Sequence, residues 1–128
     1  MKLAQRILGF VGVAFGLATI VAGGRVLAGA DPGYVVFRPL LFFNTAMGVV
    51  YVAAGVITLR SVARGKLAAA AIFALNLLVL GIIGYVYATS SDVAIDSIRA
   101  MSFRTFVWLV VFLGLAWLDR GRHAPGSG

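Results

Sequence analysis

Four long apolar runs constrain the fold of this chain more than any other feature of its sequence. They cover about residues 7–28, 39–59, 67–88 and 98–118, and short polar segments separate them. A helix crosses the roughly 30 Å hydrocarbon core of a bilayer in about 20 residues, whereas a barrel strand needs only about 10. A helix also satisfies its own backbone hydrogen bonds in lipid. The runs therefore predict four transmembrane helices.

The overall composition agrees with a membrane protein. The 128 residues are 62% hydrophobic and 12% charged, with a mean hydropathy of +1.04. A soluble domain of this length has too small an interior to bury so much apolar surface. We therefore predict a single all-α integral membrane domain over residues 1–128, with its four helices in an antiparallel bundle and a polar tail at 119–128.

The N-terminal segment fits two interpretations. Lys2 and Arg6 precede the first apolar run, and small residues follow it at 28–30, which is also the pattern of a cleaved secretory signal peptide. However, the run is longer than the usual signal-peptide core, and Arg25 interrupts the approach to the cleavage site. We therefore expect this segment to remain as the first transmembrane helix.

The connections between the runs carry recognisable signals. In the sequence Asp-Pro-Gly, Pro32 fixes its own φ and Gly33 can adopt a positive φ, which predicts a chain reversal after the first helix. Pro39 follows at a position that suits the first turn of a helix. Residues 60–66 are predicted to form a short basic loop between the second and third spans.

The polar segment before the fourth run predicts a short interfacial helix on the membrane surface. Asp92 is a candidate N-cap for it. In the residues that follow, Ile98 and Met101 fall on one side of a helix and Asp96 and Arg99 on another. Such an amphipathic helix would lie on the membrane before the fourth span begins.

Basic residues are distributed unevenly between the two sides that four spans define. The more basic side carries Lys2, Arg6, Arg60, Arg64, Lys66, Arg120 and Arg122, and the other carries Arg25, Arg38, Arg99 and Arg104. Because cytoplasmic segments are enriched in Lys and Arg, both termini are predicted to be cytoplasmic, in a multi-pass protein of the cell membrane or an inner membrane. The basic segments border lipid, so anionic lipid headgroups are the expected partner and nucleic acid is not.

Polar residues inside the apolar runs are the candidate functional residues, because such side chains face protein or water. At a rise of about 1.5 Å per residue, Tyr51 and Asn76 fall near mid-membrane on adjacent helices, and we predict a hydrogen bond between them. Thr19 and Asn44 fall together in the outer half of the membrane.

Two arginines extend this second polar cluster. Arg25 and Arg38 flank the predicted turn, and either is expected to join Thr19 and Asn44. One interpretation is that the polar pairs only fix the register of the helices. The other is that they line an outward-facing site beneath the turn, positive enough to hold an anionic or hydrogen-bonding ligand.

The first span contains the pattern Gly12-xxx-Gly16. Glycines at this spacing let two helices approach closely in a membrane. We expect Gly12 and Gly16 to pack within the chain, with a contact to another subunit as the alternative.

Several classes of chemistry lack the residues that they need. The sequence has no cysteine, which excludes disulfides and thiolate metal sites. Its one histidine, His123, lies in the tail, and no glutamate occurs. All four aspartates fall at a surface, so there is no carboxylate in mid-membrane and no candidate catalytic group. We therefore expect no metal, no cofactor and no enzyme activity.

Two functions from different classes remain. The Gly- and Ala-rich helices and the missing catalytic groups favour a non-catalytic structural or accessory subunit, which packs against partner membrane proteins or against itself as an oligomer. The alternative is a small oligomeric transporter or channel for a small anionic or polar solute. In that case the polar residues inside the spans would line its pathway.

Overall fold

The computed structural model describes residues 2–33 and 36–123. All regular secondary structure in this part of the chain is helical. The helices are α1 (Lys2–Leu27), α2 (Arg38–Arg60), α3 (Val62–Thr89) and α4 (Ile95–His123). Each is long and apolar enough to cross a membrane. The prediction of an all-α fold with four helices long and apolar enough to span a membrane is therefore confirmed.

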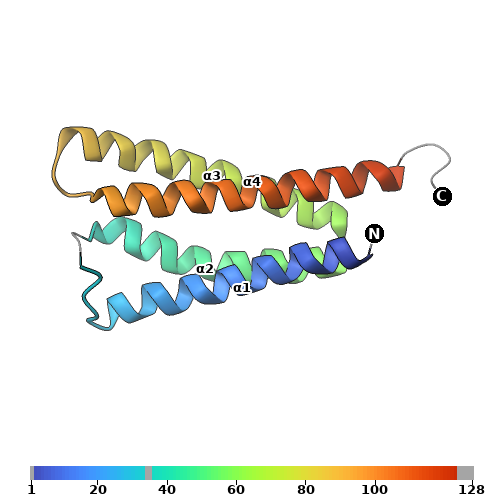
Figure 1. Cartoon of the computed structure of the whole chain (residues 1–128), viewed down its shortest axis with the longest axis horizontal. Helices are drawn as coiled ribbons and strands as arrows, with labels where there is room; N and C mark the ends of the chain where they lie inside the picture. Colours follow the sequence, from blue (N-terminus) through green and yellow to red (C-terminus); the bar gives the residue numbers. More distant parts are fainter. Residues whose placement is uncertain (1, 34–35, 124–128) are drawn as a thin grey trace.

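The helices associate as two close pairs, α1 with α2 and α3 with α4, which are joined mainly through α2 and α3. Figure 1 shows that α1 begins and α4 ends at one end of the molecule, which we call the terminal end. The end of α1, the start of α2 and the connection between α3 and α4 lie at the opposite end, which we call the loop end (Figure 1). Helices α1 and α4 contact each other only sparsely.

Glycines bring the backbones of α1 and α2 into direct contact. A Cβ atom added to Gly16 would lie 2.6 Å from the carbonyl oxygen of Gly48, and one added to Gly55 would lie 2.6 Å from that of Gly9. A Cβ on Gly12 would lie 3.0 Å from the Gly55 Cα. The structure therefore places Gly12 and Gly16 in a contact within the chain.

The connection between α2 and α3 differs from the predicted basic loop. Helix α2 ends at Arg60 and α3 begins at Val62, so Ser61 alone separates them. Ser61 has extended backbone angles, and its side chain accepts a hydrogen bond from the Arg64 backbone N–H at 3.2 Å. The prediction of a loop over 60–66 is wrong because this serine caps α3 about one and a half turns earlier than expected.

The start of α4 also differs from the prediction. Ile95 begins one continuous helix that runs through the fourth span, in place of a separate interfacial helix before it. Met101, Thr105 and Trp108 are all buried and recur at helical spacing. This buried stripe runs on into the span without a break, which explains why the chain does not turn onto the membrane surface.

At the terminal end, α4 remains helical beyond the predicted span. Lys66 Nζ donates a hydrogen bond to Asp119 Oδ2 at 2.7 Å, and the two side chains form an ion pair that links α3 to α4. Helix α4 continues to His123, so the predicted polar tail is helical over 119–123. The remainder of that tail, 124–128, lies outside the described residues.

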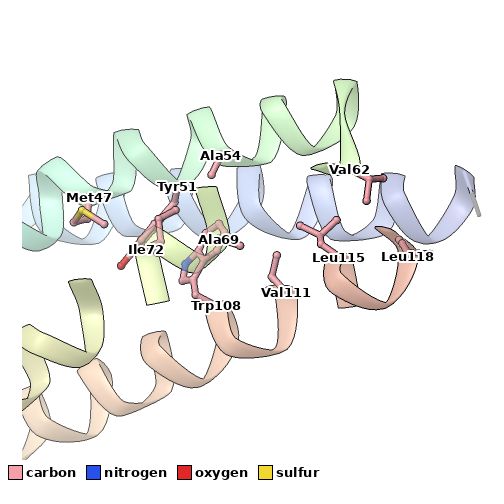
Figure 2. Packing of buried hydrophobic residues seen from close by; sticks show 10 residues of the cluster. All are labelled: Met47, Tyr51, Ala54, Val62, Ala69, Ile72, Trp108, Val111, Leu115 and Leu118. Carbon is pink, nitrogen blue, oxygen red and sulfur yellow. The ribbon is translucent and has the colours of Figure 1, made fainter. Parts of the chain in front are cut away.

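Two clusters of buried apolar residues fill the interior. The larger is centred on Tyr51, Ile72 and Trp108, which come from α2, α3 and α4 and lie close together in Figure 2. The smaller lies toward the loop end and includes Leu40 and Met101. A cavity described below adjoins this second cluster, because Leu40 lines both.

Candidate intramembrane binding site

A cavity of about 220 Å³ lies at the loop end between α1, α2 and α4. The connection from α1 to α2 contributes Pro32 and Val36 to its lining. Val26 of α1 and Leu40 of α2 supply part of the apolar wall. The polar lining consists of Thr19, Asn44, Ser97 and Arg104. The cavity is thus an apolar container with a few convergent polar groups, which is the usual form of a small-molecule site.

The structure brings the predicted pair of Thr19 and Asn44 together in this cavity. Thr19 is buried, and its hydroxyl donates to the Phe15 carbonyl oxygen at 2.8 Å. The Thr19 oxygen keeps its capacity to accept a hydrogen bond. Asn44 Oδ1 is buried and finds no hydrogen-bond partner within residues 2–33 and 36–123. Because such acceptors are rare in folded proteins, Asn44 needs an explanation.

Arg104 supplies positive charge to the cavity. It lies nine residues after Ile95 on α4, which places its Cα about 14 Å along the helix from that end at 1.5 Å per residue. It is half-buried, and its guanidinium also interacts with the Tyr51 side chain. Among the described residues that line the cavity, none is acidic. Arg104 is therefore the one charged residue among the described residues that line the cavity.

The predicted hydrogen bond in mid-membrane is present. The Tyr51 hydroxyl donates to Asn76 Oδ1 at 3.2 Å, and both side chains are fully buried. The Tyr51 ring packs against Trp108 and Phe15, with ring centroids 5.1 and 5.5 Å away. Through its interaction with Arg104, Tyr51 links this central pair to the cavity.

The other two predicted arginines lie elsewhere. Arg25 is exposed near the end of α1 and is absent from the described lining of the cavity. Arg38 lines a second, more open recess of about 270 Å³ beneath the same connection, together with Asp31. There the Asp31 Oδ1 accepts a hydrogen bond from the Gly33 backbone N–H at 2.8 Å. The arginine that joins Thr19 and Asn44 is therefore Arg104.

Sequence reasoning missed Arg104 because a helix break was expected before the fourth span. With that break, Arg104 would have stood at the membrane surface with Arg99. The signal that could have found it is the absence of glycine and proline from Ile95 to Arg104. A continuous helix places Arg104 well below its own first turn. A charged group at that depth marks a candidate functional site.

No group of three His, Cys, Asp or Glu side chains lies close enough to hold a metal ion in residues 2–33 and 36–123. No protein-family model, curated protein or solved structure matches this chain. We therefore infer the function from the geometry of the cavity.

Proposed function

We propose that this protein is a non-catalytic membrane protein that binds an anionic group in the cavity between α1, α2 and α4, as a small transporter or binding subunit would. The observation that carries this proposal is the position of Arg104 in a half-enclosed cavity whose described lining contains no carboxylate. A cation in a low-dielectric site attracts an anion far more strongly than one in water does. Hydrogen-bonding groups from Thr19, Asn44 and Ser97 converge on the same space.

The proposal includes an orientation in the cell membrane. We propose that the four helices form an antiparallel bundle in the membrane. We also propose that both termini are cytoplasmic, because the more basic segments lie at the terminal end. The cavity would then belong to the outer half of the membrane. Anionic headgroups of the inner leaflet would contact the basic terminal end.

A purely structural or accessory subunit has less support from the geometry. Such a subunit needs close packing and lipid-facing surfaces, which the glycine contacts of α1 and α2 supply. It does not need a cavity that contains a charged group and the buried Asn44 Oδ1, for which the described chain offers no partner. Association with itself or with other subunits is compatible with a binding role.

The proposal is tested by ligand-induced stabilisation of the purified protein in detergent. The panel contains phosphate, short carboxylates, and alkyl phosphates and carboxylates that partition into the micelle. At least one anion should raise the Tm, because a ligand at 100 times its Kd stabilises the folded state by about 2.7 kcal/mol. The rise should disappear in Arg104→Gln and persist in Arg99→Gln, whose arginine is exposed on the same helix.

Two outcomes would count against the proposal. One is that no anion of the panel stabilises the wild-type protein. The other is that Arg104→Gln and Arg99→Gln reduce the stabilisation equally, which would indicate a general surface-charge effect. Flux measurements in liposomes with the stabilising anion then separate transport from binding alone.

A further inference from the structure

The cavity has a side opening between α1 and α4. Ala22 of α1 and Ala100 of α4 both line the cavity and are both exposed on the surface of the molecule. We call this place the α1–α4 seam. Helices α1 and α4 contact each other only sparsely, and the two seam residues carry nothing larger than a methyl group. In a membrane this opening faces the lipid chains, since both helices are membrane spans.

The size of the cavity sets a limit on what it holds. Its volume of about 220 Å³ is below the roughly 300–1,000 Å³ of pockets that hold drug-sized ligands. That space accommodates a polar headgroup and does not accommodate an acyl chain in addition. A lipid bound here must therefore leave its chains outside, and the α1–α4 seam provides the exit.

The polar groups of the cavity select for two properties of a headgroup. Arg104 favours an oxyanion, because a guanidinium forms charge-assisted hydrogen bonds with phosphate and carboxylate oxygens. Asn44 lines the cavity, and its Oδ1 is a buried acceptor without a donor in the described part of the chain, so the amide must rotate to present this oxygen to a ligand. A phosphodiester has no donor of its own, whereas a hydroxyl on the headgroup provides one.

We propose that the cavity binds the hydroxylated headgroup of an anionic lipid, which enters through the α1–α4 seam with its chains remaining in the bilayer. The oxyanion lies against Arg104, and a headgroup hydroxyl donates to Asn44 Oδ1. This inference rests on the proposed function and narrows its ligand from any anion to a lipid-borne one.

Native mass spectrometry of the detergent-solubilised protein tests this inference. Equal amounts of phosphatidylglycerol, phosphatidylmethanol and phosphatidylcholine compete for the protein, and the ratios of bound lipid are measured. Phosphatidylglycerol and phosphatidylmethanol carry the same charge, and only the first has headgroup hydroxyls. We expect phosphatidylglycerol to be retained at least about tenfold over phosphatidylcholine, as expected for a charge-assisted contact. Phosphatidylmethanol should fall between them.

Matched variants assign the two contacts. Arg104→Gln should lower retention of both anionic lipids at least about fivefold, and Arg104→Lys should restore part of it, whereas Arg99→Gln should change neither. Asn44→Leu has a similar side-chain volume and should abolish only the preference for phosphatidylglycerol over phosphatidylmethanol. Equal effects of Arg99→Gln and Arg104→Gln would overturn the site. An unchanged preference in Asn44→Leu would overturn the role of the hydroxyl.

The route is tested with Ala100→Leu, which narrows the seam, and with Ala74→Leu as a control at an exposed alanine of α3. Only the first should reduce lipid retention. Glycerol 3-phosphate, which has the headgroup without chains, separates the two proposals. If it binds through Arg104 as well as the lipid does and Ala100→Leu has no effect, the lipid inference fails and the proposed anion site stands. If neither the lipids nor the anion panel bind, both fail.

Discussion

Helix α1 meets its neighbours α2 and α4 through interfaces of opposite kinds. Toward α2, glycines leave no room for even a methyl group, since a Cβ on Gly16 would lie 2.6 Å from the Gly48 carbonyl oxygen. Toward α4, the alanines Ala22 and Ala100 border a cavity of about 220 Å³. Small residues therefore occur in both places, although elsewhere α1 meets α4 through larger side chains such as Phe15 and Phe103, whose ring centroids are 6.0 Å apart. On the α2 side the small residues allow close contact of backbones, and on the α4 side they border a cavity.

The difference follows from what faces each small residue. The α1 glycines lie opposite glycines and backbone atoms of α2, so the two helices approach each other. At the seam, the small side chains line the cavity together with the larger Arg104, Leu40 and Phe37. A small-residue pattern in a membrane helix thus permits close packing but does not by itself ensure it. The following predictions test this contrast, from the largest expected effect to the smallest.

Gly16→Leu tests the closed interface. The leucine side chain would overlap the backbone of α2, and the strain should destabilise the protein by about 3 kcal/mol or more. Loss of helicity in a sodium dodecyl sulfate titration measures the change. Gly24→Leu is the control, because no described atom lies within 4 Å of the Cβ position at Gly24. Equal losses in the two variants would remove the distinction between the two faces of α1.

Asp119→Asn tests whether the terminal end fixes α4 independently of the cavity. The ion pair with Lys66 spans 2.7 Å, with Asp119 nearly buried and the Lys66 side chain 31% exposed. Because water partly screens the lysine, we expect a loss of about 1–2 kcal/mol in the same titration. Asp96→Asn, at an exposed position of α4, should have almost no effect. Anion-induced stabilisation should be the same in both variants, and a selective loss in Asp119→Asn would show that the two ends are coupled.

Tyr51→Phe tests the polar pair between the two helix pairs. Removal of the hydroxyl breaks its 3.2 Å hydrogen bond with Asn76 and should cost about 1 kcal/mol. Tyr87→Phe alters an exposed tyrosine of α3 and serves as the control. If the two variants unfold at the same denaturant concentration, the hydrogen bond does not contribute to the stability of the protein.

The sequence predicts the depth of a residue along a helix better than it predicts which neighbouring helix that residue faces. Depth along a helix follows from residue number and a fixed rise per residue, and this was sufficient to predict the hydrogen bond between Tyr51 and Asn76. The same reasoning placed Thr19 and Asn44 at one level, and the cavity contains both. The four spans likewise follow from length and hydropathy.

The rotation of each helix about its own axis does not follow from residue number. Contacts between helices that are distant in sequence do not follow from it either. Helices α1 and α4 are far apart in the chain, and nothing in either sequence specifies that Ala22 and Ala100 border the same opening. Arg104 was missed for a related reason, because its depth depends on whether the helix begins at Ile95 or after a break. The buried stripe of Met101 and Trp108 decides that question, and burial is a tertiary property.

Gly24→Ala should have the smallest effect, and its sign is informative. The added methyl group meets no described atom within 4 Å, so the substitution adds helix propensity without overlap. We expect a gain of about 0.5–1 kcal/mol, as for alanine in place of glycine in an open helix. A clear loss would mean that α1 is packed on this side too, and the contrast between its interfaces would not hold.

The most direct test of the central claim, that the cavity at the loop end is positively charged and accessible to small molecules, is thiol labelling at Ser97. The protein has no cysteine, so Ser97→Cys is a unique probe of a buried position that lines the cavity. Ala69→Cys, fully buried in the core, is the control. We predict that the Ser97 thiol reacts with small methanethiosulfonates, faster with an anionic reagent than with a cationic one, and that Arg104→Gln removes this preference. A Ser97 thiol as inert as the one at Ala69, or an anion preference that survives Arg104→Gln, would contradict the account.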